Sequence, residues 1–173
     1  GGVPFLINEI GKIIAHDLTF LGPIAFLFIA FVLFLNFRTL RGVLFPLLTV
    51  VITVIWTLGT LSMLHYELAI ITNIIPVILL AVGSAWPIHL INRVNSETDT
   101  DRKQALTKSL LYVALPVTLA AIAAMVGFLT FVFGSYLAMI QQFGVFSALG
   151  IFFALLLSLT FTPALIASLK PKK

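Results

Sequence analysis

The segment from Gly83 to His89 contains the residue types and spacing that most suggest a functional site. It reads Gly83-Ser84-Ala85-Trp86-Pro87-Ile88-His89 and lies inside a long apolar stretch. Proline has no amide hydrogen to donate to the carbonyl of Gly83, and glycine adds no side-chain bulk, so we expect a local break in a membrane helix that opens a cavity. Trp86 and His89 would flank this cavity, and imidazole is the side chain that changes charge near neutral pH. The alternative is a proline kink packed against other helices, with His89 at the membrane interface.

Two further polar residues in apolar stretches are candidates for the same cavity, because polar groups inside a membrane are often functional. Thr118 could satisfy the carbonyl that Pro87 frees, and Asn73 could bond across helices or lie near the outer interface. A structural role is the alternative for both, since threonine in a membrane helix usually bonds to its own backbone. No Asp, Glu, Lys or Arg occupies the middle of an apolar stretch. The chain therefore offers no buried carboxylate for proton coupling.

The sequence contains no arrangement typical of an enzyme. His-Glu-x-x-His, Gly-x-Ser-x-Gly and Walker motifs are all missing. The chain has no cysteine, which excludes disulfide frameworks, cysteine-type zinc sites and thiol catalysis. We therefore expect no enzymatic activity, no metal site and no cofactor.

The composition is that of a membrane protein. Of 173 residues 61% are hydrophobic and 9% charged, against about 45–50% and about 25% in soluble domains, and the mean hydropathy is +1.18. Runs of 20, 25, 25 and 61 uncharged residues follow Asp17, Arg41, Glu67 and Lys108. A spanning helix needs about 20 apolar residues, so the first three runs hold one span each and the last holds two. The sequence predicts an all-α bundle of five membrane helices.

The expected elements follow from these runs. We expect spans over about 18–37, 43–64, 68–91, 110–133 and 137–168, which form one membrane domain over 18–169. Residues 1–17 are expected to form an amphipathic interfacial helix that leads into the first span, since Leu6, Ile10 and Ile13 share one face. Residues 170–173 form a basic tail.

The distribution of basic residues predicts the orientation. Nine of the ten Lys and Arg residues lie in the 37–42 loop, the 92–108 segment and the C-terminus, and only Lys12 lies on the other side. The positive-inside rule then places the N-terminus outside and the C-terminus in the cytoplasm of a cell (inner or plasma) membrane. Because the net charge of +4 flanks apolar spans, we expect membrane lipid and no nucleic acid as a partner.

Small residues in the last two spans are expected to bring neighbouring helices close together. They are Ala120, Ala124, Gly127, Gly144, Ala148 and Gly150. The alternative is that this small-residue face borders a lipid groove.

Several segments, taken in order and spacing, resemble one family over nearly the whole chain. They are Phe37–Leu47, Trp56–Gly59, Ile75–Gly83, Ile88–Arg93, Gly127–Leu129, Gln142–Gly150 and Leu159–Leu165. They are similar to the RND superfamily, and within it to the MMPL-like exporter branch, which is related to sterol-sensing domains.

The resemblance implies an exporter of lipids or other hydrophobic molecules, driven by the proton gradient. Each half of such a protein has one span, a large extracytoplasmic domain and five more spans, and the assembly is often an oligomer. This chain resembles the last five spans of one half. It begins Gly1-Gly2 without a methionine, and we interpret it as a piece of a longer polypeptide.

One position departs from the family pattern. Aligned on Ile88-His89, the place of the proton-carrying Asp is taken by Ala85, and Trp86 stands where a Tyr often follows. The proton relay therefore cannot be carried over to this half. The alternative function is a sterol-sensing-like module that binds lipid for regulation or as a scaffold, without transport.

Overall fold

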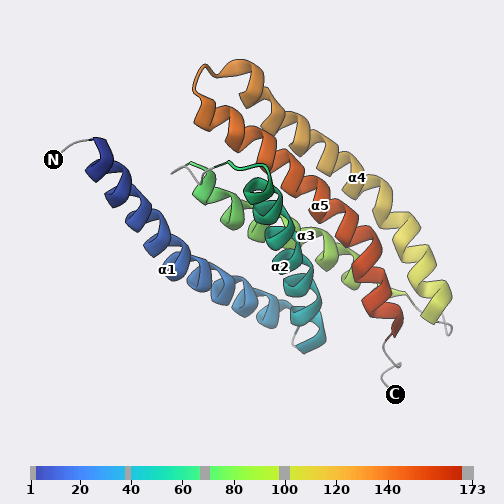
Figure 1. Cartoon of the computed structure of the whole chain (residues 1–173). Coiled ribbons are helices and arrows are strands. Elements are labelled where there is room, and N and C mark those ends of the chain that lie inside the picture. Colours follow the sequence, from blue (N-terminus) through green and yellow to red (C-terminus); the bar gives the residue numbers. More distant parts are fainter. Residues whose placement is uncertain (1–2, 38–39, 67–70, 98–101, 169–173) are drawn as a thin grey trace.

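The protein is a bundle of five long helices in a computed structural model that describes residues 3–37, 40–66, 71–97 and 102–168 (Figure 1). In chain order the elements are α1 (Val3–Phe37), α2 (Leu40–Met63), the short 3-10 helix η1 (Thr72–Ile74), α3 (Ile75–Ser96), α4 (Arg102–Gly134) and α5 (Ala138–Ser168). Within the described ranges there is no strand. The predicted all-α fold is confirmed.

Four of these helices are long and apolar enough to cross a membrane. Their spanning segments in the described chain are Gly42–Met63, Thr72–Ser96, Lys103–Gly134 and Ala138–Ser168. The apolar part of α1, Gly22–Leu35, is shorter than these. Four of the five predicted membrane helices are thus supported by length and composition, and the first stays a prediction.

The N-terminal region forms one continuous helix. We predicted an interfacial helix over 1–17 that leads into a span, and in the structure α1 runs from Val3 to Phe37 as one helix with Pro23 inside it. The polarity of α1 changes along its length. Its first half includes an exposed ion pair, Lys12 Nζ to Glu9 Oε1 at 2.8 Å. A change in polarity does not require a change in backbone conformation, so the boundary at residue 17 between an interfacial part and a span stays a prediction. A place for the first turns in the membrane interface stays a prediction.

Helix α3 is the centre of the bundle, and α1 and α4 are at its edges. In the spanning segment of α3 56% is buried, against 11% in that of α4. Helix α3 packs against α2 and α5, whereas α4 packs mainly along α5. Helix α1 lies apart from the other helices at its N-terminal end and approaches them near the start of α2 (Figure 1).

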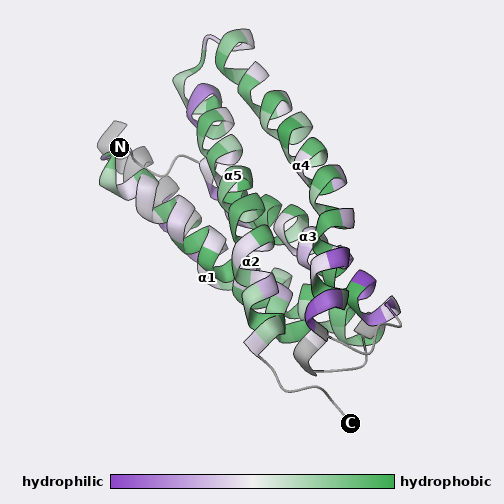
Figure 2. Cartoon of the chain, turned by 90° about the vertical axis from the view of Figure 1, so that its right-hand side faces the viewer, coloured by the Kyte–Doolittle hydropathy of each residue, from purple (hydrophilic) through white to green (hydrophobic). Residues whose placement is uncertain are grey.

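The buried side chains form two clusters along α3. The main cluster includes Ile75, Leu79 and Trp86 of α3 together with Phe146 and Ile151 of α5. The second cluster lies near the end of α3 and consists of Leu90, Ile91, Leu106 and Ile166. Figure 2 shows that strongly hydrophilic residues gather at this same end, around the end of α3 and the start of α4.

Helix α2 ends in a Schellman motif. The amide of Tyr66 donates to the carbonyl of Leu61 at 3.2 Å, and the amide of His65 donates to that of Ser62 at 3.0 Å. His65 has a φ of 57°, in the left-handed region where such a motif places the residue directly after the helix C-cap. Tyr66 then packs edge-on against Phe146 of α5, with 5.3 Å between the ring centroids.

Candidate functional site

Helix α3 continues through the segment that we expected to break. It is helical from Ile75 to Ser96, so the predicted break at Gly83 and Pro87 is not formed. Pro76 lies in the first turn, where no helical amide bond is lost. Pro87 lies inside the helix and is almost fully buried, so neighbouring helices surround the turn that it weakens.

Gly83 lies where three helices meet. A methyl group added at Gly83 would lie 3.4 Å from Cγ2 of Val50 in α2 and 3.5 Å from Cβ of Ala154 in α5. The next residue, Ser84, is buried, and its hydroxyl donates to the carbonyl of Ala81 at 3.1 Å. Both residues therefore have local structural explanations: close helix packing and a bond within the same helix.

The other residues of this segment divide between core and surface. Trp86 is 7% exposed and belongs to the main cluster, and Ala85 is partly buried against that cluster. His89 is exposed. The methyl group of Ala85 therefore packs against apolar side chains. A coupling role for His89 stays a prediction.

Asn73 and Thr118 lie on different elements from this segment. Asn73 is half-buried in η1, and its Oδ1 atom is buried without a hydrogen-bond partner in the described chain. Thr118 is half-buried in α4. No hydrogen bond from Thr118 to α3 is present among the described residues, so its predicted bond to the carbonyl freed by Pro87 is not formed there.

Buried hydroxyl groups gather between α2 and α5, and this grouping was not predicted from the sequence. Thr49, Thr53 and Thr57 are all fully buried on one face of α2. Each hydroxyl donates to the carbonyl four residues earlier, at 2.8–2.9 Å. Their spacing of four residues was the available signal, because it places them on one side of a helix.

One of these hydroxyls is linked to α5. The Oγ1 atoms of Thr49 and Thr162 are 3.1 Å apart. Since the single hydroxyl proton of Thr49 goes to the carbonyl of Phe45, Thr162 must donate to Thr49. Ser147 and Ser158 of α5 are also buried, and their hydroxyls have no partner in the described chain. The bundle interior therefore carries unused hydrogen-bonding capacity.

The buried hydroxyl groups of this interior can form hydrogen bonds with a polar group, but they do not become charged. Hydroxyl groups donate and accept hydrogen bonds, and they neither gain nor lose a proton near neutral pH. In the described spanning segments, the Lys and Arg residues lie only near the ends of α3 and α4, at Arg93, Lys103 and Lys108. Proton coupling through these hydroxyl groups would therefore need a further group that titrates.

The predicted small-residue contacts are formed by α5 more than by α4. A Cβ on Gly144 would lie 2.6 Å from the carbonyl oxygen of Phe128, and one on Gly150 would lie 2.6 Å from Cδ1 of Leu79. Ala148 is buried, and Ala124 packs against the main cluster.

Two of the predicted packing residues point away from the described helices. Ala120 and Gly127 are exposed, and nothing lies within 4 Å of a Cβ placed on Gly127. Ala121, the neighbour of Ala120 in α4, is fully buried. We had assigned the packing to a neighbouring face of α4, so the contacts expected for Ala120 and Gly127 are absent from the described chain.

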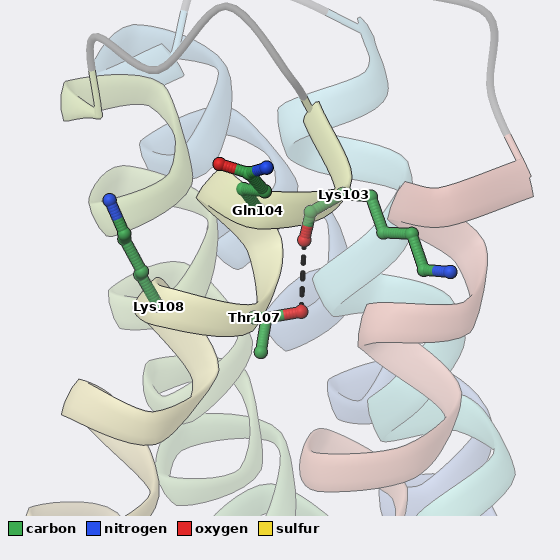
Figure 3. A pocket seen from close by; sticks show the side chains of 4 residues that line it. All are labelled: Lys103, Gln104, Thr107 and Lys108. Carbon is green, nitrogen blue, oxygen red and sulfur yellow. Dashed lines mark hydrogen bonds between the residues drawn. The ribbon is translucent and has the colours of Figure 1, made fainter.

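A hollow of about 480 Å³ lies at the start of α4, lined by Lys103, Gln104, Thr107 and Lys108 (Figure 3). The hydroxyl of Thr107 donates to the carbonyl of Lys103 at 2.9 Å and so closes this turn of the helix. In the sequence analysis these basic residues served only to predict the orientation of the chain in the membrane.

Comparisons with known proteins agree with the resemblance described above. The sequence matches the family model of the MMPL family over residues 1–172. A protein of Methanocaldococcus jannaschii (strain ATCC 43067 / DSM 2661 / JAL-1 / JCM 10045 / NBRC 100440), whose name describes it as a membrane protein, is 29% identical over 167 residues, which cover 95% of this chain and 43% of that protein. The chain therefore spans less than half the length of this curated relative. No solved structure matches.

Proposed function

Because this chain belongs to the MMPL family, which it matches over residues 1–172, we propose that it forms the membrane-domain half of an RND-type exporter. The family consists of transporters, and the chain is a multi-pass membrane protein. The proposed substrates are lipids or other hydrophobic molecules. The proposed partners are membrane lipid, a second half with an extracytoplasmic domain, and further copies of the assembly.

The length of the relative supports the proposal that this chain is one half of a larger transporter. This chain aligns to 43% of the M. jannaschii protein, which leaves room in that protein for a second unit of similar size. The exposed surface of the bundle would also accommodate a further protein unit. Helix α4 is buried only along the side that faces α5 and α3.

The exposed side chains of α1 support the same proposal. Phe20, Leu27, Phe28 and Phe31 are each more than half exposed. In a membrane, such a face contacts either lipid or another helix, and large aromatic side chains suit both. We propose that α1 and the outer face of α4 contact the rest of the transporter as well as lipid.

Proton coupling, in this proposal, resides outside this half. Ala85 presents a methyl group to the main cluster at the position of the family's relay Asp, and a methyl group cannot carry a proton. This observation also favours the second candidate function, a lipid-binding module for regulation or scaffolding without transport. The two candidates differ in whether the complete protein moves substrate.

Reconstitution in liposomes tests the proposal. We expect the complete protein to move a fluorescent lipid under an imposed proton gradient, whereas residues 1–173 alone should show no gradient-dependent flux, because they lack a coupling carboxylate. Flux from the 173-residue chain alone would contradict the half-transporter role. Binding of lipid by the complete protein without any flux would select the regulatory module.

The proposed orientation has its own test. The chain has no cysteine, so single cysteines at Tyr136 and Ser96, which are both exposed, report the two ends of the bundle. A membrane-impermeant thiol reagent on intact cells should label Tyr136→Cys, and should label Ser96→Cys only after permeabilisation. The reverse pattern would invert the orientation of the N- and C-termini.

A further inference from the structure

Two buried polar groups, one on α3 and one on α5, lack the hydrogen-bond partners that their surroundings would normally give them. Pro87 has no amide hydrogen, so the carbonyl of Gly83 loses the donor that a regular α-helix supplies. Both residues are buried, and Pro87 almost fully so. On α5, Ser158 is only 2% exposed, and its hydroxyl has no partner in the described chain. A buried polar group that stays unpaired costs free energy, so both groups call for a partner.

The contacts between α3 and α5 advance in step along both helices. A Cβ on Gly150 would lie 2.6 Å from Cδ1 of Leu79. Four residues further along each helix, a Cβ on Gly83 would lie 3.5 Å from Cβ of Ala154. The two helices therefore run in the same direction here, and each contact is followed by another about one turn later.

The next turn brings the two unpaired groups to the same level. Pro87 follows Gly83 by four residues and Ser158 follows Ala154 by four, so each stays on the side of its helix that faces the other helix. The carbonyl of Gly83 points along α3 toward Pro87, as helical carbonyl groups point toward the C-terminal end. The helices remain together beyond this level, because the second buried cluster contains residues of both. The carbonyl of Gly83 and the hydroxyl of Ser158 therefore face the same space between the helices.

A third polar group borders this space. Thr162 follows Ser158 by one more turn of α5 and is fully buried, and its hydroxyl donates to Oγ1 of Thr49 at 3.1 Å. That bond uses the only proton of the Thr162 hydroxyl, but its oxygen can still accept a hydrogen bond. This level of the interior thus offers one free donor, from Ser158, and two acceptors.

We propose that an ordered water molecule binds between α3 and α5 at this level. The water accepts a hydrogen bond from the hydroxyl of Ser158 and donates to the carbonyl of Gly83 and to Oγ1 of Thr162. Buried waters typically make about three hydrogen bonds to groups that have no other partner. Ordered water is also one of the means by which membrane helices satisfy a carbonyl that proline has freed. In this site the water replaces the amide that Pro87 lacks, and α3 stays helical through the proline.

A hydrogen bond within α5 is the alternative for Ser158. Serine in a membrane helix can donate to the carbonyl of the preceding turn of its own helix. That bond would satisfy Ser158 but would leave Gly83 unchanged, so the contributions of Ser158 and Pro87 to stability would be independent. A water bridge makes them dependent, because the water needs both the hydroxyl of Ser158 and the carbonyl that Pro87 leaves free.

A double-mutant cycle in the complete protein, measured by thermal unfolding in one detergent, tests the proposal. Ser158→Ala should lower the unfolding temperature by about 2–4 °C, the shift expected for the loss of one hydrogen bond. In the Pro87→Ala background the new amide takes the carbonyl of Gly83, and Ser158→Ala should then cost less than half as much. Equal losses in the two backgrounds would overturn the site. An unchanged or higher unfolding temperature for Ser158→Ala alone, as expected for a hydroxyl without any partner, would also overturn it.

Ser147→Ala provides the comparison within the same helix. Ser147 is fully buried, and its hydroxyl likewise has no partner among the described residues, but it lies about three turns from Ser158 along α5. Its effect should be the same with Pro87 and with alanine at that position. If Ser147 were coupled to Pro87 as strongly as Ser158 is, the proline would act on the whole bundle and the assigned site would be wrong.

A structure of the complete protein that shows ordered waters gives the direct readout. We expect density within hydrogen-bond distance of both Oγ of Ser158 and the carbonyl oxygen of Gly83, and we expect it to be lost in Ser158→Ala. A wild-type structure of that quality without this density would overturn the proposal even if the variants failed to fold. None of these outcomes depends on transport, so the test is independent of the exporter proposal.

Discussion

Replacing Gly83 with leucine is expected to destabilise the bundle by about 3 kcal/mol or more, whereas alanine at the same position should fit. The methyl group of alanine would meet Val50 and Ala154 at 3.4 and 3.5 Å, which are ordinary contact distances. The further carbons of leucine have no space between these two helices. They must push α2 or α5 away from α3, and such overpacking typically costs about 1–3 kcal/mol in tolerant cores and more where backbone must move.

Thermal unfolding of the purified variants in one detergent measures this difference. The variant Gly83→Ala should unfold close to the wild-type temperature and Gly83→Leu well below it. The comparison also distinguishes the two interpretations of the segment. A cavity next to Gly83 would accept the leucine side chain, so an unchanged unfolding temperature for Gly83→Leu would sink the packing interpretation and restore the predicted cavity.

Much of the fold follows from the charges in the sequence. A charge inside hydrocarbon is costly, so uncharged runs of 20 residues or more have few uses other than spanning a membrane. The predicted spans over 43–64 and 137–168 lie within three residues of α2 and α5 at each end. Helix α4 begins at Arg102, earlier than its predicted span, because a helix can extend into the polar interface beyond its apolar part.

The side on which each helix packs could not be predicted in the same way. In a helix of a soluble protein the side facing the core is apolar and the opposite side is polar. In a membrane helix such as α4 both sides can be apolar, because one contacts protein and the other contacts lipid. Ala120 and Ala121 are therefore equivalent in the sequence, although Ala120 is exposed and Ala121 is fully buried. Proline gave a similar ambiguity in α3, since Pro87 is compatible both with a break and with a helix held together by its neighbours.

The hydrogen bonds of the buried polar residues could be predicted only in part from the sequence. Local bonding of serine and threonine to the same helix was expected, and Ser84 and Thr53 bond in this way. The contact between Thr49 and Thr162 joins residues that are 113 positions apart. Such a pair depends on how α2 and α5 are placed in space, and no local pattern in the sequence specifies that placement.

Alanine at Gly144 is expected to destabilise the contact between α4 and α5 by about 1–3 kcal/mol. Its Cβ would lie 2.6 Å from the carbonyl oxygen of Phe128 and 3.0 Å from Cβ of Phe131. Both neighbours are fixed to the backbone of α4, so a rotamer change cannot relieve the clash and the helices must separate. The rings of Phe128, Phe131 and Phe143, whose centroids lie 5.7–6.3 Å apart, would then lose part of their packing.

Gly127→Ala is the matched control, because Gly127 lies in α4 with nothing within 4 Å of an added Cβ. The chemical change is the same, and helix propensity alone favours alanine over glycine by about 1 kcal/mol. Unfolding temperatures measured in one detergent should fall for Gly144→Ala and stay level or rise for Gly127→Ala. If both variants fell equally, the loss would come from the removal of glycine itself, and the close approach of α5 to the carbonyl of Phe128 would not be what holds the two helices together.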